Sequence, residues 1–345
     1  MRAAIYEQYG GPITIEQLRD PTPTDHGVVI KVEASGLCLS DWHGWMGHDK
    51  DIKLPHVPGH ELAGSIAAVG RNVKKWKKDQ RVTVPFVGGC GSCEYCSSGN
   101  QQVCDHQFQP GFTAWGSFAE YVAIDYADEN LVTLPEAFDY ISAASLGCRF
   151  ITAYRGVRHQ AQLQPGQFIA VHGCGGVGLS AIQIAKAMEA QVIAIDISDE
   201  KCEFTKALGA DYTINANKES VVDAVKEISH GGVHVSVDAL GSEITCLNSI
   251  QNLRKRGKHI QIGLMTAKDE SPKIPMGEII AKELEIIGSH GMQAHKYGEM
   301  FELISLKGID LNQLIAQTIS LEQLPLHLPI MDKHKTNGIT VVSSF

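Results

Sequence analysis

The sequence predicts an α/β protein with two domains, one rich in short strands and one built on a parallel sheet. The chain has 345 residues, which is enough for roughly two domains of ordinary size. Its first part carries short β-rich runs bounded by Gly and Asp. From about residue 147, apolar strand-like runs alternate with helical patterns. Such alternation implies parallel strands that are covered by helices on both faces.

The expected elements follow one another in a simple order. In the first part, β-rich runs stand at 28–34, 64–69 and 80–84. In the second part, strand-like and helical runs alternate, at 168–172, 176–188, 192–196, 201–208, 212–215, 233–238, 258–262 and 285–288. A shorter mixed tail ends in an apolar run at 340–342, which predicts a closing strand.

The charge and hydropathy of the chain argue against several classes of partner. Lys and Arg number 30 against 39 Asp and Glu, so the formal net charge is −9. A negative chain is a poor ligand for nucleic acid or an anionic membrane. No apolar run approaches the roughly 18–20 residues of a membrane span, and the N-terminus lacks the apolar core of a secretory signal. We therefore expect a cytoplasmic protein with neither kind of partner.

Four of the nine cysteines form a compact motif in a loop rich in Gly and Ser. Cys90, Cys93, Cys96 and Cys104 have the spacing C-x2-C-x2-C-x7-C. Short gaps let four thiolates converge on one tetrahedral zinc ion at about 2.3 Å, and four sulfurs leave no open coordination place. The motif predicts a structural zinc site with no catalytic role. An iron–sulfur cluster takes the same ligands and is the alternative, whereas a nucleic-acid zinc ribbon is disfavoured by the negative charge.

A glycine-rich segment at residues 173–178 fits the pattern G-x-G-x-x-G. An apolar strand precedes it, a helix follows, and Asp196 ends the next strand eighteen residues past Gly178. Glycines here let the backbone approach a pyrophosphate at the helix N-terminus. Asp196 would accept hydrogen bonds from ribose hydroxyls and repel a 2′-phosphate, which favours NAD over NADP. A tight turn without a ligand is the alternative. The expected contacts are Gly173, Gly175, Gly176, Val177 and Gly178.

Three further short motifs complete a recognisable order along the chain. They are G-L-C-L-S-D at 36–41, G-H-E at 59–61 and L-G-C at 146–148. Together with the cysteine loop and the glycine-rich turn, they make the chain resemble the zinc-dependent alcohol dehydrogenases of the medium-chain dehydrogenase/reductase superfamily over essentially its whole length. The resemblance implies a β-rich GroES-like catalytic domain from residues 1–146 and 291–345. It also implies an inserted Rossmann NAD-binding domain, a doubly wound parallel sheet, from residues 147–290.

The same resemblance implies a second, catalytic zinc site, and so two zinc ions per chain. Cys38, His60 and Cys148 would hold this ion with the fourth place open, where it acts as a Lewis acid on an alcohol. Glu61 resembles the neighbouring carboxylate that approaches the metal during ligand exchange. Asp41 is similar to the carboxylate that orients the histidine ligand.

Other site residues are implied in the same way. Ser40 and His43 match a proton relay, although His43 on its own would also read as an exposed loop residue. Lys201 matches a lysine that contacts the adenosine ribose. Apolar walls of the substrate pocket are expected from residues that would equally fill a core, namely Trp45, Phe86, Phe112 and Trp115.

Three positions depart from the family pattern or have no assigned partner. Leu39 and Ile339 stand where well-studied members carry basic residues that touch the pyrophosphate. We therefore expect the helix N-terminus to contribute more of the coenzyme binding, and NADH to leave faster. Cys174 lies inside the glycine-rich turn; a small inert filler is favoured there over a reactive thiol.

The function that the resemblance implies is the reversible NAD-linked oxidation of primary or secondary alcohols to aldehydes or ketones. A polyol, formaldehyde or other specialised dehydrogenase of the superfamily is the alternative, although Cys148 disfavours the polyol enzymes, which commonly place a carboxylate there. A non-catalytic protein that binds NAD and zinc is a further alternative. By analogy with relatives we expect a homo-oligomer, with a tetramer favoured over a dimer.

Overall fold

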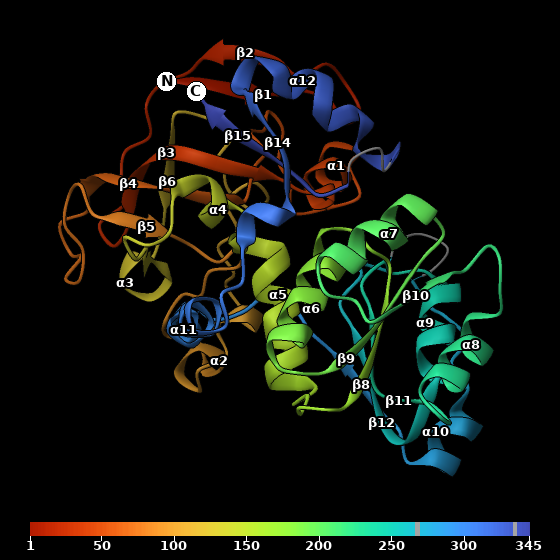
Figure 1. The fold of residues 1–345 in the computed structure, drawn as a ribbon. Coiled ribbons are helices and arrows are strands. Elements are labelled where there is room, and N and C mark those ends of the chain that lie inside the picture. Colours follow the sequence, from red (N-terminus) through yellow and green to blue (C-terminus); the bar gives the residue numbers. More distant parts are fainter. Residues whose placement is uncertain (266–269, 334–336) are drawn as a thin grey trace. The chain divides into compact units, whose positions relative to one another are not determined.

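The computed structural model describes residues 1–265, 270–333 and 337–345 and divides into two compact units (Figure 1). The first unit combines Met1–Ile151, Gly291–Glu299 and Leu314–Phe345. The second combines Thr152–His290 and Met300–Gln313. Both chain ends thus belong to one unit. The domain limits expected from the sequence stay a prediction.

The second unit contains a six-stranded parallel sheet. Its order is β10-β9-β8-β11-β12-β13, so the chain runs outward from β8 in one direction and then, from β11, in the other. This is the strand order of a Rossmann fold, and the predicted doubly wound parallel sheet is confirmed. The strands are β8 (Phe168–His172), β9 (Gln191–Asp196), β10 (Tyr212–Asn215), β11 (Val233–Asp238), β12 (Leu253–Gln261) and β13 (Glu285–Gly288).

Helices cover this sheet on both faces, which explains why most residues of its central strands are buried and apolar. Figure 1 shows α6 on one side of the strands and α8 and α9 on the other. Ile169, Ala170 and Val171 of β8 are accordingly fully buried. The helices of the unit include α6 (Gly176–Ala187), α7 (Asp199–Ala207), α8 (Val221–Ile228), α9 (Glu243–Gln251) and α10 (Met276–Lys282).

The first unit is rich in antiparallel strands, as predicted. Its main sheet has the order β14-β15-β3-β4-β5-β7, and β6 also pairs with β3. The closing strand expected at 340–342 is confirmed, because β15 pairs with the end of β3. The strands are β1 (Arg2–Ile5), β2 (Thr14–Gln17), β3 (Val28–Leu37), β4 (Glu61–Val69), β5 (Arg81–Thr83), β6 (Tyr121–Ile124), β7 (Val132–Thr133), β14 (Ile315–Ser320) and β15 (Ile339–Ser344).

Short helices and loops connect these strands. A five-residue π-helical turn at Leu146–Phe150 is unusual, because such turns are rare and concentrate at functional sites. The helices of this unit are α1 (Leu39–Trp45), α2 (Glu94–Ser97), α3 (Ala127–Asn130), α4 (Tyr140–Ala144) and α12 (Leu324–His327). Two further helices begin in the first unit and have most of their residues in the second, namely α5 (Ile151–Tyr154) and α11 (Tyr297–Lys307).

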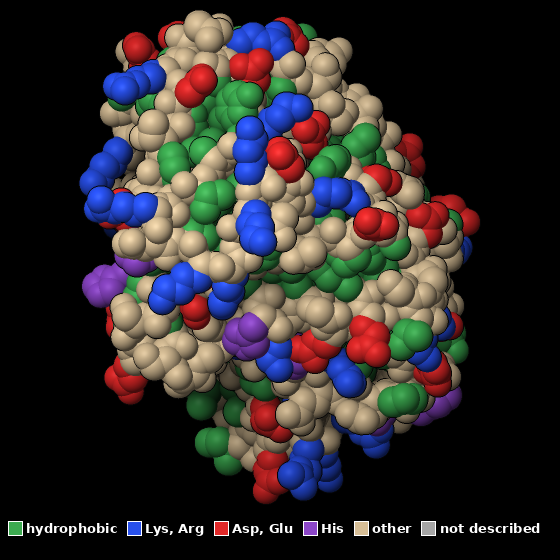
Figure 2. Space-filling view, turned by 90° about the vertical axis from the view of Figure 1, so that its left-hand side faces the viewer, with side chains coloured by type: hydrophobic (Ala, Val, Ile, Leu, Met, Phe, Trp, Pro, Cys, Tyr) green, Lys and Arg blue, Asp and Glu red, His purple; other side chains and the backbone are tan. Residues whose placement is uncertain are grey.

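Charged side chains of both signs are mixed on the surface. On the face drawn in Figure 2, Lys and Arg side chains lie interspersed with Asp and Glu, with apolar side chains between them. Among the helices in the described part of the chain, none combines the length and the apolar character that crossing a bilayer requires.

Candidate metal and coenzyme sites

Three segments of the first unit bring four metal-ligating side chains together. Cys38 follows β3, His60 precedes β4, and Cys148 lies in the π-helical turn. The register of β3 against β4 pairs Gly36 with Glu61, which places the first two segments at the same end of the two strands. One ligand atom from each of Cys38, His60, Glu61 and Cys148 lies within 4.8 Å of the others. The predicted catalytic ligands therefore converge, with Glu61 beside them.

The orientation of His60 leaves one nitrogen for a metal. Its Nδ1 lies 2.8 Å from Oδ1 of Asp41, while its buried Nε2 has no hydrogen-bond partner among the described residues. Asp41 also accepts hydrogen bonds from the backbone N–H groups of Cys38, at 2.9 Å, and Gly59, at 3.0 Å. An unpartnered buried imidazole nitrogen facing two cysteine sulfurs is the donor set that zinc prefers. The residues present fit a zinc ion.

A hydrogen bond between Cys38 and Cys148 shifts the pKa values of the two thiols in opposite directions. The hydrogen bond with Cys148 lowers the pKa of the Cys38 thiol well below its ordinary value, and the charge of Arg149 adds to this against the opposing effect of burial. The same hydrogen bond, and then burial, raise the pKa of Cys148 well above its ordinary value. Metal binding must displace any proton that these two thiols carry.

A buried ion pair is formed by the residues that directly follow two of the metal ligands. The carboxylate of Glu61 is fully buried and forms an ion pair with Arg149, which is 6% exposed. Burial raises the pKa of Glu61, and the guanidinium of Arg149 opposes that shift. Arg149 was not expected from the sequence. The sequence shows only that Arg149 directly follows the ligand Cys148. It does not show which side chain Arg149 contacts.

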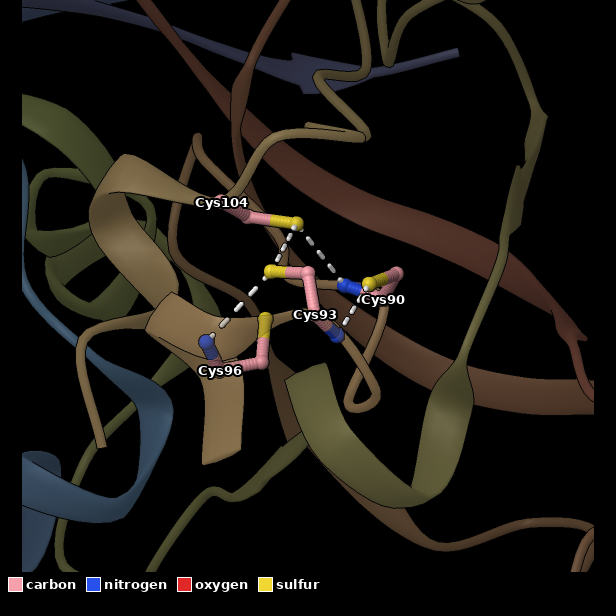
Figure 3. Close-up of side chains that lie close together, drawn as sticks. All are labelled: Cys90, Cys93, Cys96 and Cys104. Carbon is pink, nitrogen blue, oxygen red and sulfur yellow. Dashed lines mark hydrogen bonds between the residues drawn. The ribbon is translucent and has the colours of Figure 1, made fainter. Parts of the chain in front are cut away.

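The four-cysteine loop forms a second cluster, drawn in Figure 3. The sulfur atoms of Cys90, Cys93, Cys96 and Cys104 all lie within 4.8 Å of one another. Backbone N–H groups donate to three of the sulfurs: Cys93 N to Cys90 Sγ at 3.4 Å, Cys96 N to Cys93 Sγ at 3.5 Å, and Cys90 N to Cys104 Sγ at 3.3 Å. Such N–H···S bonds stabilise thiolates. The loop backbone is therefore folded to present four sulfurs to one closed tetrahedral position.

The glycine-rich turn of the second unit has the shape expected of a pyrophosphate site. A Cβ at Gly178 would lie 1.9 Å from the carbonyl oxygen of Gly173, and Gly173 has a positive φ of 90°, so both positions require glycine. Gly175 instead faces open space, with no atom of the described residues within 4 Å of a Cβ placed there. It is the N-cap of α6, and no side chain in the described part of the chain caps that helix end. The free N-terminus of α6 suits an anion.

Asp196 is held beside this turn by the backbone. Its Oδ2 accepts from the N–H of Cys174 at 2.8 Å, and its Oδ1 accepts from Ile197 and Ser198 at 2.8 and 3.1 Å. Lys201 lies on α7, whose N-cap Ser198 accepts from the backbone N–H of Lys201. Burial and then the charge of Asp196 raise the pKa of the Cys174 thiol well above its ordinary value. Cys174 therefore has the properties of an inert small filler.

The two relay residues expected from the sequence lie on α1. The Ser40 hydroxyl is 3.7 Å from the sulfur of Cys38. His43 is half-buried, and its Nδ1 lies 2.9 Å from Nδ1 of His48. Burial lowers the pKa of His43, and the neighbouring His48 lowers it further. His48 was not expected from the sequence, and its spacing of five residues from His43 was its only signal.

Of the four aromatic residues expected in the substrate pocket, two lie beside the metal ligands. The ring centroids of Phe112 and Phe86 are 5.0 and 6.1 Å from that of His60. Trp45 instead packs in a core cluster, and its Nε1 donates to the carbonyl of Gly11. Trp115 is 42% exposed and donates to the carbonyl of Pro55.

The two positions that lack the family's basic residues differ in environment. Leu39 is the half-buried first residue of α1. Ile339 is fully buried at the start of β15, where it pairs with Ile315 of β14. An apolar side chain is thus accommodated at each position by its local packing.

Comparison with known proteins gives consistent matches over both parts of the chain. Residues 24–136 match the family model described as the alcohol dehydrogenase GroES-like domain, and residues 176–306 match the zinc-binding dehydrogenase model. An alcohol dehydrogenase of Geobacillus stearothermophilus is 33% identical over 99% of this chain and 98% of its own. An NAD-dependent alcohol dehydrogenase of Sulfurisphaera tokodaii is 34% identical over 99% of both chains. The structure of the alcohol dehydrogenase TADH from Thermus sp. ATN1 aligns over 100% of both chains, with 27% identity and a TM-score of 0.90.

Proposed function

The chain belongs to the zinc-dependent alcohol dehydrogenases of the medium-chain dehydrogenase/reductase superfamily, and from this premise we propose that Cys38, His60 and Cys148 hold its catalytic zinc. The enzyme is an NAD-linked alcohol oxidoreductase with a GroES-like and a Rossmann part. The observation that carries the assignment of the ligands is the buried Nε2 of His60, which has no partner among the described residues and faces the two sulfurs.

When bound, zinc supplies a Lewis acid that lowers the pKa of an alcohol, and NAD accepts the hydride. The side chains of this protein orient and deprotonate the substrate. Asp41 holds the imidazole of His60 through Nδ1. The hydroxyl proton of the substrate would pass to Ser40 Oγ as the proton of Ser40 leaves through a ribose hydroxyl of the bound coenzyme to His43, which would release a proton to solvent. Burial and the neighbouring His48 lower the pKa of His43, which favours the neutral imidazole that a relay of this kind needs as its proton acceptor.

The substrates we propose are primary or secondary alcohols and the corresponding aldehydes or ketones. Phe86 and Phe112, whose rings lie next to His60, would supply apolar walls for the carbon chain. Gly173, Gly175, Gly176, Val177 and Gly178 would hold the pyrophosphate of NAD at the N-terminus of α6, with Asp196 and Lys201 at the adenosine ribose.

The test is a measurement of NADH formation with primary, secondary, aromatic and polyol substrates, with NADP in parallel. Cys148→Ser should lower kcat/KM at least a hundredfold and remove one zinc from the chain. Cys246→Ser, at a buried cysteine outside both clusters, should change neither the activity nor the zinc content. A Cys148→Ser enzyme with full activity would refute the assignment of the catalytic ligands.

A second zinc in the four-cysteine loop completes the proposed content of two zinc ions per chain. The four converging sulfurs and the N–H···S bonds of that loop support it. We further propose a cytoplasmic location, since the six proposed cysteine ligands must stay reduced.

We propose that the enzyme is a homo-oligomer, with a tetramer favoured over a dimer by analogy with relatives. The edge of the second unit supports association, because β13 is the last strand of its sheet and each residue of α10 is half-buried or exposed. Met276, Ile280 and Ile286 are 52%, 74% and 42% exposed there.

Replacing Ile280 with Lys tests this surface. A charge at the centre of an apolar contact should lower the mass measured by light scattering, at low micromolar protein, to that of smaller species. Leu306→Lys is the matched control, because Leu306 is 76% exposed on α11, away from this edge in the sequence. An unchanged mass for Ile280→Lys would exclude association through this edge.

A further inference from the structure

Arg149 contacts the neighbours of the other two metal ligands. Its Nη1 donates to the carbonyl of Leu37, the residue before Cys38, at 3.1 Å. Its Nε donates to Oε1 of Glu61, the residue after the histidine ligand, at 3.0 Å, and its Nη2 donates to Oε2 of the same carboxylate. Since Arg149 itself follows the third ligand, one guanidinium connects all three ligand segments.

Glu61 is a potential fourth ligand of the metal. One of its carboxylate oxygens lies within 4.8 Å of the ligand atoms of Cys38, His60 and Cys148. Carboxylates are ordinary zinc ligands, and a fourth protein ligand would close the coordination place that a substrate oxygen requires. Both oxygens of Glu61 are occupied, however, because Oε1 accepts from the backbone N–H and Nε of Arg149 while Oε2 accepts from Nη2.

The surrounding packing makes room for this pair. A Cβ at Gly36 would lie 2.4 Å from Oε2 of Glu61 and 3.0 Å from a terminal guanidinium nitrogen of Arg149. The pair is buried, so no bulk water competes for the carboxylate. A buried ion pair is weak evidence for stability by comparison with apolar packing, and a role in orienting groups is the better explanation for it here.

We propose that Arg149 is a positioning residue that keeps the Glu61 carboxylate off the catalytic zinc, so that the fourth coordination place stays open. The inference deepens the proposed function and rests on it. Without the guanidinium, Glu61 is free to become the fourth ligand and closes the site.

The test uses the full-length protein with Co²⁺ in place of zinc and imidazole as the added ligand. In the wild-type protein, imidazole should enter the open place and shift the visible absorption of the cobalt; the four-sulfur site is closed and contributes no imidazole-dependent change. Arg149→Met should weaken imidazole binding at least tenfold. The double variant Arg149→Met/Glu61→Gln should restore it to within threefold of wild type, since the competing carboxylate is gone.

A matched control separates this role from general loss of an arginine. Arg81, in the same unit, donates to the carbonyl of Phe138 and lies over the ring of Tyr140 at 4.7 Å. Arg81→Met should leave imidazole binding unchanged. If Arg149→Met does not fold, Arg149→Lys replaces it, alone and with Glu61→Gln. Lysine cannot hold both carboxylate oxygens and Leu37 together, so we expect at least threefold weaker binding that Glu61→Gln restores.

Two results would overturn the inference alone: wild-type imidazole binding in the Arg149 variants, or weakened binding that Glu61→Gln does not restore. The second result would mean that Arg149 only supports the fold. A wild-type cobalt protein that does not respond to imidazole would have no open metal site. That result would overturn the proposed function together with the inference.

Discussion

Asp41 fixes the position of two metal ligands with one carboxylate. Its Oδ1 accepts from Nδ1 of His60 and from the N–H of Gly59, and its Oδ2 accepts from the N–H of Cys38. Each of these three partners donates an N–H group, so each contact requires an oxygen acceptor on residue 41. The carboxylate therefore orients the imidazole and also the backbone that carries the first cysteine.

Asp41→Asn should weaken zinc binding at the catalytic site by about ten- to a hundredfold. Asparagine offers one oxygen, so its NH₂ group must face a donor, either at Cys38 or at His60. Competition with a chelator, followed as zinc released per chain, measures the effect. Asp139→Asn is the control, since Asp139 caps α4 by accepting from Ser142 and asparagine caps equally well. Equal zinc retention by the two variants would contradict this role of Asp41.

Residues with a short-range pattern were predictable, and those defined by long-range contacts were not. Cys38 and His60 belong to local motifs that the sequence displays directly. Arg149 acquires its role through Glu61, 88 residues earlier in the chain, and local sequence carries no record of that contact. Aromatic residues show the same limit, because the sequence does not distinguish Phe112, beside His60, from Trp45 in the core.

At the scale of elements, the turn between β8 and α6 allows two glycines to be compared. Gly178→Ala should disrupt the turn itself, because the new methyl group would meet the carbonyl of Gly173. Gly175→Ala adds a methyl group in open space with an ordinary φ of −84°. That variant should keep its melting temperature and lose NADH affinity, because the methyl group occupies the space where a pyrophosphate would approach α6.

Fluorescence titration of NADH and thermal unfolding, measured on both variants, separate these effects. We expect NADH affinity to fall at least tenfold in each variant, with a lower melting temperature only in Gly178→Ala. Undiminished NADH affinity in Gly175→Ala would place the pyrophosphate elsewhere.

Strands were predicted best where an apolar run was bounded by turn residues. The bounds of β8, β10, β11 and β13 match the expected ranges residue for residue. β12 begins at Leu253 rather than 258, because Leu253 already pairs with Val233 of β11. The register then shifts before Lys258 pairs with Val235, and Arg256 has a positive φ of 61° within this irregular part. β14 was missed, since it is defined by parallel pairing with β15 rather than by its own pattern.

At the scale of the whole molecule, the stability of the second unit depends on buried polar groups in its sheet. His172, at the end of β8, is 1% exposed, and its Nε2 lies 2.9 Å from the side-chain amide of Asn252. His259 on β12 is equally buried and bonds to Ser249 of α9. These groups join neighbouring elements by hydrogen bonds inside an otherwise apolar layer, so their protonation state affects folding as a whole.

Acid should destabilise the protein through His172. Burial, and then the charge of His259, lower the pKa of His172 from 6.5 to about 3. Between these values the unfolded chain binds a proton that the folded chain does not, so the free energy of unfolding falls as pH decreases from 6.5 toward 3. The slope is about 1.4 kcal/mol per pH unit for this one group. Above pH 6.5 its contribution is fully present and independent of pH.

His172→Asn should therefore lower stability at pH 7 and flatten its dependence on pH between 6.5 and 4. Urea unfolding midpoints measured across this pH range test how steeply the free energy of unfolding depends on pH, rather than its absolute value. His230→Asn is the matched control, because His230 is exposed with a φ of 54°, which asparagine tolerates. Its pH profile should parallel that of the wild type. If the His172 variant keeps the wild-type slope, the acid sensitivity arises from other groups, and the buried imidazole contributes only packing and its hydrogen bond to Asn252.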